Sequence, residues 1–184
     1  DDRNHQRSRP GLLLRKIVDE LHAAGEFQTL GAVADTGGLI TTLDRAIAEL
    51  KRAAVEPQEL ERTVEAIKGG DGTAKTADLV KVYNRYQQSL LDDDVYDVEG
   101  HIWQARDALR DCDDASATGL DQVRAIAADG FTDFTPTQLE VLNLLAGRIG
   151  KLVITIGVAD DGRRRLWHWT RRTLANLRRR FGGE

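Results

Sequence analysis

Residues 123–145 read VRAIAADGFTDFTPTQLEVLNLL and contain the pattern on which the fold prediction rests. The apolar run 123–128 predicts a buried strand, with Asp129 at its carboxyl end. Thr135 and Pro136 are residue types that favour the cap and the first position of a helix. We therefore expect a strand, an aromatic turn and an amphipathic helix, in this order.

A second strand is expected at 152–158, after a helix whose apolar residues recur at helical spacing. Strand, helix, strand is the minimal unit of a parallel sheet, with a right-handed crossover. Ligands of such sheets bind beyond the carboxyl ends of the strands, which is where Asp129 is expected. If the chain has a nucleotide or metal site, or the remnant of one, we therefore expect it at Asp129. Gln138 is third in the helix that follows.

The rest of the chain is predicted to be mostly helical. Loops are expected at 69–74 (GGDGTA) and 111–119 (DCDDASATG), and Asp97 is placed to cap the fifth helix. The predicted fold class is thus α/β, with a helical subdomain over 1–115 and a strand–helix–strand–helix segment over 116–184. The helices are expected near 12–24, 39–50, 57–67, 76–91, 98–109 and 164–181.

Composition excludes several classes of protein. No apolar run approaches the ~20 residues of a membrane span, and the polar start is no signal peptide, so we expect a cytoplasmic protein without a membrane partner. One cysteine, Cys112, excludes a disulfide framework within the chain. The absence of methionine and the presence of only two expected strands predict a fragment of a longer protein.

The last helix is rich in arginine although the chain has a net charge of −4. Two interpretations are open: its arginines contact DNA phosphates, or they form a solvated face near a helix C-terminus. The tryptophans Trp103, Trp167 and Trp169 likewise either stack on bases or pack beside apolar stripes. The histidines form no pair at metal-ligand spacing.

If the arginines of the last helix contact DNA phosphates, the candidate contacts are Arg171, Arg172, Arg178 and Arg179.

The string DGFTDFTPTQLEVL resembles a motif in the B subunits of AddAB-type helicase–nucleases, which are inactivated relatives of UvrD-like superfamily 1 helicases. The resemblance extends over about 75–184. In active helicases the corresponding core reads aspartate, glutamate, an aromatic or apolar residue, glutamine and aspartate. This chain departs at Gly130 and Thr132, while Pro136 and Gln138 match the tail of the motif. The residues at the five core positions here are Asp129, Gly130, Phe131, Thr132 and Asp133.

The resemblance implies part of a RecA-like P-loop domain in a protein for DNA double-strand break processing and recombinational repair. DNA and an A-type motor subunit would be its partners. ATP and Mg²⁺ would be cofactors of the longer protein, with Asp129 as metal ligand, and Asp129 and Gln138 near the nucleotide. An iron–sulfur cluster would lie in a downstream nuclease domain, since Cys112 cannot supply four cysteines.

Whether the longer protein is an active enzyme is left open by the sequence. The chain contains no G-x-x-x-x-G-K-[ST] phosphate loop, so we expect it to be a non-catalytic scaffold or DNA-contacting part. One alternative is a fragment of an active superfamily 1 helicase, against which Gly130 argues because glycine cannot activate water. The other is a helical protein–protein interaction module without a nucleic-acid role.

Overall fold

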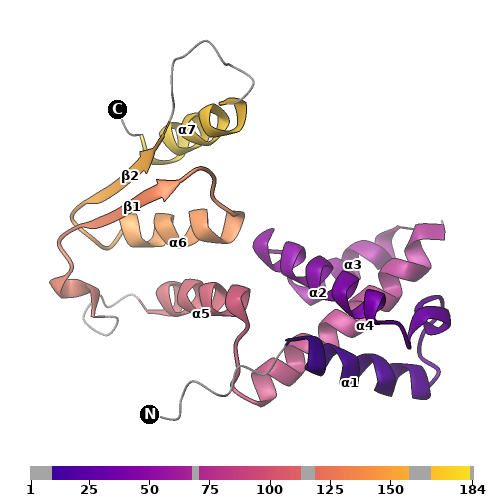
Figure 1. The fold of residues 1–184 in the computed structure, drawn as a ribbon. Coiled ribbons are helices and arrows are strands. Elements are labelled where there is room, and N and C mark those ends of the chain that lie inside the picture. Colours follow the sequence, from indigo (N-terminus) through magenta and orange to yellow (C-terminus); the bar gives the residue numbers. More distant parts are fainter. Residues whose placement is uncertain (1–9, 68–70, 113–118, 158–166, 183–184) are drawn as a thin grey trace. The chain divides into compact units, whose positions relative to one another are not determined.

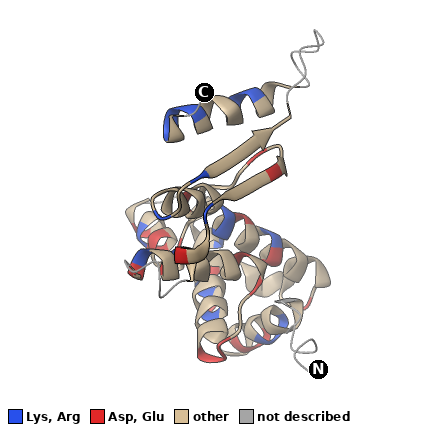
Figure 2. Ribbon diagram, turned by 90° about the vertical axis from the view of Figure 1, so that its left-hand side faces the viewer, with Lys and Arg blue, Asp and Glu red and all other residues tan. Residues whose placement is uncertain are grey.

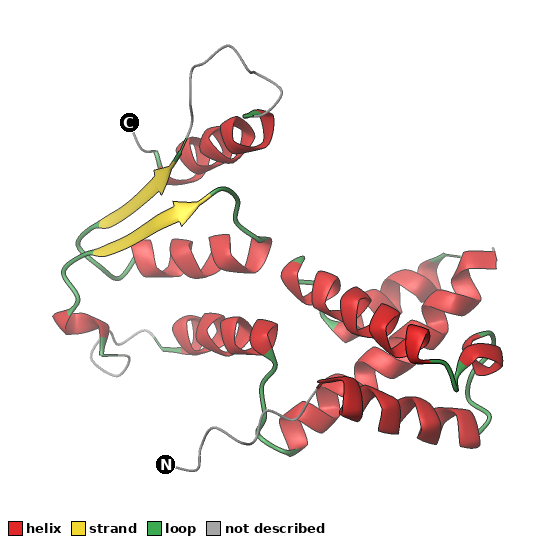
Figure 3. Ribbon diagram, viewed as in Figure 1, coloured by secondary structure: helices red, strands yellow, loops and turns green. Residues whose placement is uncertain are grey.

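The computed structural model describes residues 10–67, 71–112, 119–157 and 167–182. The chain forms two compact units, Asp1–His101 and Ile102–Glu184. Helices make up the described part of the first unit, and the second contains a small parallel sheet with helices (Figures 1 and 3). The prediction of a mostly helical α/β protein is confirmed at this level. The RecA-like fold and the subdomain boundary at 115/116 stay predictions.

The first unit is built on the helices α1 (Pro10–Ala23), α2 (Gly37–Arg52) and α4 (Asp71–Asp92), which are labelled in Figure 1. Buried side chains of their amphipathic faces form one cluster. In α2, Leu39, Leu43 and Ile47 recur at helical spacing and are buried, as predicted. In α4, Tyr83 lies fully buried in the same cluster. The elements are α1 (Pro10–Ala23), the 3-10 helix η1 (Leu30–Val33), α2 (Gly37–Arg52), α3 (Pro57–Ala66), α4 (Asp71–Asp92) and the first residues of α5 (Val98–Asp111).

The predicted loop at 69–74 is wrong over residues 71–74, because α4 already begins at Asp71. Gly72 costs a helix about 1 kcal/mol relative to alanine. Thr73 and Ala74 are half-buried, and α4 packs against α3. Packing of this first turn therefore outweighs the local preference of glycine for a loop. Residues 68–70 lie outside the described part of the chain.

Asp78 of α4 is a fully buried carboxylate that holds the segment before η1. It accepts hydrogen bonds from the backbone N–H groups of Gln28 (2.9 Å), Thr29 (2.7 Å) and Leu30 (3.0 Å), and from the Thr29 hydroxyl (3.0 Å). Burial alone would raise the pKa of Asp78, but these donors stabilise the anion and lower the pKa below its usual 3.8. Asp78 is therefore charged and structural.

A second buried network ends at Asp97. The Lys51 side chain is 1% exposed, and its ammonium donates to both Asp97 carboxylate oxygens at 2.7 and 2.8 Å. The Tyr86 hydroxyl donates to Asp97 at 3.1 Å; burial and the negative charge of Asp97 raise the pKa of Tyr86. The Gly100 N–H donates to Asp97 at 2.6 Å, which confirms the predicted cap of α5.

The second unit is organised by one parallel strand pair. Ile126, Ala127 and Ala128 of β1 align with Leu152, Val153 and Ile154 of β2, and the register shifts before Phe131. Helices α6 and α7 both contribute side chains to the cluster on one face of this sheet, among them Leu142 and Leu177. The elements are η2 (Leu120–Gln122), β1 (Ile126–Phe131), α6 (Pro136–Ala146), β2 (Leu152–Ile156) and α7 (His168–Phe181).

The first strand begins three residues later than predicted, so the prediction of 123–128 is wrong in position. The Ile126 N–H donates to the Lys151 carbonyl, whereas the Val123 N–H is used in the turn of η2. Asp129 therefore lies within β1 instead of beyond its end. The predicted closing helix 164–181 is seen from His168. Three parts of the predicted elements lie outside the described residues: 164–166 of this helix, 113–118 of the second loop, and 158 at the end of the second strand.

Arg148 joins α6 to the end of α5. Its guanidinium donates to the carbonyl oxygens of Leu144 (3.0 Å), Cys112 (3.0 Å) and Leu109. Cations at a helix C-terminus satisfy carbonyls that lack partners within the helix.

Among the described helices, none is long and apolar enough to span a membrane.

We predict that Asp78→Asn lowers the free energy of unfolding by about 1–3 kcal/mol, because an amide cannot accept from all of these donors. The folded-state pKa of Asp78 lies below its unfolded value, so its stabilisation is present above about pH 4 and is lost as the pH falls. Urea titrations from neutral to acidic pH should show a flatter pH dependence in the variant. Asp92→Asn, at an exposed position of α4, is the matched control, and equal losses in both variants would contradict the prediction.

We predict that Arg148→Lys destabilises the chain by about 1–3 kcal/mol, because one ammonium cannot reach three carbonyl oxygens that a planar guanidinium bridges. The measurement is the urea midpoint of unfolding. Arg124→Lys, at an exposed position before β1, should leave the midpoint unchanged. An unchanged midpoint in Arg148→Lys would show that these hydrogen bonds add nothing to stability.

Candidate functional site

The candidate site begins at an irregularity in β1. The parallel register shifts between Ala128 and Phe131, at Asp129 and Gly130. Gly130 has φ 80°, in the left-handed region that side-chain-bearing residues rarely adopt. A Cβ atom at Gly130 would meet no heavy atom within 4 Å. The backbone conformation, and not a lack of space, is therefore what suits glycine at this position.

Asp129 is exposed, and its side chain is oriented by the neighbouring strand. Its carboxylate accepts a hydrogen bond from the Thr155 hydroxyl of β2. Mg²⁺ is commonly held by one or two carboxylates together with waters and phosphate oxygens. Asp129 carries a carboxylate of this kind, but within the described residues no three histidine, cysteine or acidic side chains converge on a metal position. The described residues alone do not complete a magnesium–nucleotide site, and the metal role of Asp129 stays a prediction.

Gln138 has a structural task at the start of α6. Its side-chain oxygen accepts from the Thr135 N–H at 2.9 Å, and its own N–H donates to the Thr135 hydroxyl at 3.2 Å. This reciprocal pair is a capping box, as the sequence pattern at Thr135 indicated. Gln138 also lines an apolar pocket of about 210 Å³ with Phe131 and Phe134. Among the described residues, no hydrogen bond joins Gln138 to Asp129, so its predicted nucleotide role stays untested.

Asp133 connects the turn after β1 to α7. Its carboxylate accepts from the Phe134 N–H at 2.8 Å and from the Thr173 hydroxyl at 3.1 Å. Sequence reasoning placed Asp133 in the motif but missed Thr173 as its partner. The available signal was a threonine on the same side of the helix as Leu177, where both are buried.

The predicted DNA-contact arginines lie on one helix, α7, and all four are exposed. Figure 2 shows α7, the helix ending near the C label, with basic segments and no acidic ones. Arg172 and Arg179 are seven residues apart, so they share one row about 10.5 Å apart along the axis. Arg171 and Arg178 form a second row, and Arg178 borders a groove lined by Leu174 and other apolar residues.

The three tryptophans differ in their surroundings. Trp103 is 7% exposed, and the buried Arg106 guanidinium lies 5.0 Å from its ring centre, in agreement with the packing interpretation. Trp167 is half-buried at the N-cap position of α7. Trp169 is 66% exposed, and the Arg172 guanidinium lies 5.8 Å from its ring centre. The packing interpretation is therefore wrong for Trp169.

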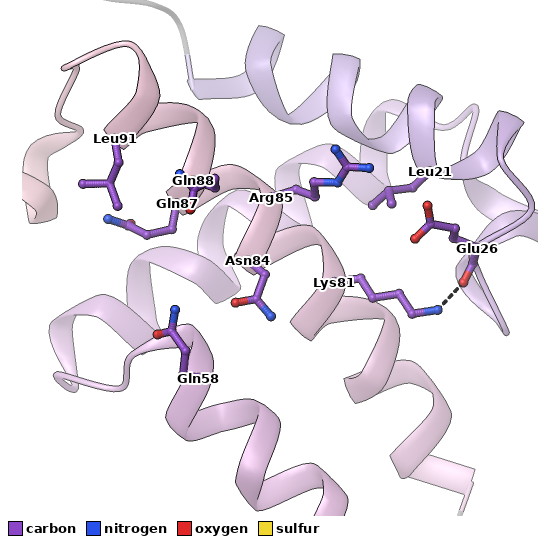
Figure 4. A pocket seen from close by; sticks show the side chains of 9 residues that line it. All are labelled: Leu21, Glu26, Gln58, Lys81, Asn84, Arg85, Gln87, Gln88 and Leu91. Atoms are coloured by element: carbon purple, nitrogen blue, oxygen red, sulfur yellow. Dashed lines mark hydrogen bonds between the residues drawn. The ribbon is translucent and has the colours of Figure 1, made fainter.

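The first unit contains a separate groove of about 370 Å³ that the sequence analysis did not identify as a site (Figure 4). Its wall is the polar face of α4, and the Lys81 ammonium donates to the Glu26 carbonyl across it. No sequence motif marks these residues, which follow the spacing of the side opposite the apolar stripe in an amphipathic helix. The α4 residues lining the groove are Lys81, Asn84, Arg85, Gln87, Gln88 and Leu91.

Comparison with known proteins shows the class of this chain. Residues 7–182 match the family described as "ADDB, N-terminal", so the chain belongs to the AddB N-terminal family. The recognition of an AddB-type protein from the motif is thereby confirmed.

Particular relatives are named as the B subunit of an ATP-dependent helicase/deoxyribonuclease. The protein of Geobacillus thermodenitrificans is 27% identical over 153 residues, which cover 79% of this chain and 12% of the relative. The protein of Alkaliphilus metalliredigens is 27% identical over 173 residues, which cover 91% of this chain and 14% of the relative. The protein of Bacillus subtilis is 28% identical over 145 residues, which cover 73% of this chain and 11% of the relative. The chain thus spans only about an eighth of the length of these relatives.

We predict that Gly130→Glu and Gly130→Ala each lower the free energy of unfolding by about 1–2 kcal/mol, because each forces a side-chain-bearing residue into a left-handed conformation. Gly130→Asn should cost less, since asparagine tolerates this region. The measurement is urea unfolding followed by circular dichroism. Gly157→Ala is the control, because Gly157 also has open space but no positive φ. Equal stability of Gly130→Ala and Gly157→Ala would contradict the backbone explanation.

Proposed function

We propose that this chain is a non-catalytic, DNA-contacting part of a helicase–nuclease B subunit. The longer protein would process DNA double-strand breaks in the cytoplasm, together with an A-type motor subunit. The observation that carries the proposal is the exposed arginine face of α7. Membership of the AddB N-terminal family supports it. Relatives named as the B subunit of an ATP-dependent helicase/deoxyribonuclease support the nucleic-acid role.

The charge distribution supports a contact with phosphates. Residues 102–184 contain 13 lysines and arginines against 11 acidic residues, although the whole chain has a net charge of −4. Helix α7 contains five arginines and no lysine, aspartate or glutamate. Guanidinium groups bind phosphate oxygens with two parallel hydrogen bonds, and each phosphate they neutralise releases counterions. A helix face of this kind suits a nucleic-acid backbone.

The geometry at Gly130 supports a non-catalytic role. In the helicases that the motif resembles, the residue after the metal-binding aspartate is the glutamate that activates water. Gly130 has no side chain for this task, and its left-handed backbone opposes a simple replacement. Asp129 retains the position of the aspartate and is held by Thr155. We infer a nucleotide-site remnant instead of a working motor.

We also infer that β1, α6, β2 and α7 belong to a RecA-like domain and that residues 1–115 form its helical insertion. Parallel sheets are normally covered on both faces. Here one face carries the core, whereas Ala127, Asp129, Val153 and Thr155 on the other face are exposed. In the longer relatives, other segments of the protein would cover this face.

The test is DNA binding by the chain and by a variant with Arg171, Arg172, Arg178 and Arg179 changed to Gln. We predict that the wild-type chain binds a labelled single-stranded oligonucleotide with an affinity that falls steeply between about 50 and 200 mM salt. The variant should bind about tenfold or more weakly at low salt, and its plot of log affinity against log salt should flatten by about 0.7 for each lost contact. Fluorescence anisotropy gives both quantities.

The matched control removes the same charge elsewhere. Lys16, Arg45, Arg62 and Lys75 are exposed in the first unit, and their joint replacement by Gln should leave the salt dependence near that of the wild type. Absent binding at low salt, or equal losses in both variants, would reject the DNA contact. The helical protein–protein interaction module would then be the better interpretation.

A further inference from the structure

We propose that Trp169 is a stacking platform for an unpaired base and that the exposed face of α7 therefore binds single-stranded nucleic acid in preference to a duplex. This inference rests on the proposed DNA contact by α7 and adds the form of nucleic acid that this face selects. It assigns a role to Trp169, which the apolar core of the second unit does not use.

The first argument is the exposure of the indole. Tryptophan is highly buried on average, and Trp103 of the same unit follows this rule at 7% exposure. Trp169 is 66% exposed, so most of its apolar surface faces solvent. Leaving this surface in water is unfavourable, and a flat partner would remove it from water. A nucleic-acid base is such a partner, and every base offers an aromatic face.

The second argument is the order of side chains along α7. Trp169, Arg172, Asn176 and Arg179 recur at intervals of three and four residues, which places them in one stripe on the helix surface. The Arg172 guanidinium lies 5.8 Å from the indole centre. The Asn176 side-chain oxygen accepts a hydrogen bond from Arg179. The stripe thus begins with an aromatic surface and continues with two cations, as a strand with a stacked base and following phosphates requires.

The third argument is that neighbouring groups orient this part of the helix. The His168 ring stands edge-on to the indole, with ring centres 5.9 Å apart and planes at 75°. The Thr173 hydroxyl lies 3.2 Å from the Trp169 carbonyl and 3.1 Å from the Asp133 carboxylate. The backbone that carries Trp169 is therefore tied to the turn after β1. A platform positioned before binding loses less conformational entropy when the base arrives.

Tryptophan and arginine also dominate protein–protein interfaces, so a protein partner is the competing explanation. The composition of α7 favours nucleic acid, because the helix contains five arginines and no acidic residue. Cores of protein interfaces are depleted of charge, whereas nucleic-acid interfaces are strongly positive. A bare base stacks only when it is unpaired, which is why the proposal specifies a single strand.

The experiment compares binding of the chain to a single-stranded oligonucleotide and to the duplex of the same sequence, by fluorescence anisotropy at low salt. Trp169→Ala should weaken single-strand binding by about 5- to 150-fold, the range found for removal of one stacked base. Duplex binding should change by less than about twofold, because duplex contacts are mainly to phosphates. Trp169→Phe should retain most of the single-strand affinity, since phenylalanine also stacks.

Controls separate stacking from folding and from charge. Leu12→Ala removes another exposed apolar side chain, in the first unit, and should leave both affinities unchanged. Trp169→Ala removes no charge, so the salt dependence of the remaining binding should match that of the wild type. Because Trp169 is exposed, circular dichroism and the melting temperature of the variant should equal those of the wild type.

The outcomes separate this inference from the proposed function. If the arginine variant loses DNA binding while Trp169→Ala keeps single-strand affinity, the DNA contact stands and the stacking platform is rejected. Equal weakening of single-strand and duplex binding by Trp169→Ala would also reject it. If neither set of changes affects DNA binding, both proposals fall. If Trp169→Ala impairs binding to the A-type motor protein and leaves single-strand binding unchanged, Trp169 is a protein contact and the inference is wrong.

Discussion

The second unit depends on the parallel pairing of β1 with β2. Because the two strands run in the same direction, the chain between them must cross over, and α6 is that crossover. The same alignment places Thr155 where its hydroxyl reaches Asp129. It also leaves the register shift at Asp129 and Gly130, which fixes the backbone of the candidate site. Moving the register by one residue would turn the core face of β2 toward solvent and remove the Asp129 contact.

Much of the fold could be predicted because local patterns and tertiary packing agree in this chain. The stripe of Leu39, Leu43 and Ile47 predicts α2, and Asp97 caps α5 as its position suggested. The position of β1 could not be predicted, because a strand's limits depend on its partner and Val123 is used in a turn instead. The start of α4 was missed for a similar reason. Packing against α3 overrides the loop preference of Gly72.

The candidate site could be predicted in its residue types but not in its geometry. The arginines of α7 are visible in the sequence, and so is the glycine that follows Asp129. The left-handed conformation of Gly130 is not, since glycine adopts many conformations. Nor could the sequence distinguish Trp169 from Trp103, because both stand beside apolar helical stripes. Only the packed structure shows that one is exposed and the other buried.

Because Gly130 has a left-handed backbone, the effect of a substitution at Gly130 depends on the residues around it. Geneticists call this dependence epistasis. A carboxylate introduced at Gly130 would arrive on a backbone that disfavours any side chain, although space for it exists. Removal of the left-handed turn would require a second change that restores regular pairing between Ala128 and Phe131. Neither change alone gives a well-placed glutamate. A side chain at Gly130 and regular strand pairing around it are therefore coupled, and a substitution that adds the first without the second places its side chain on a strained backbone.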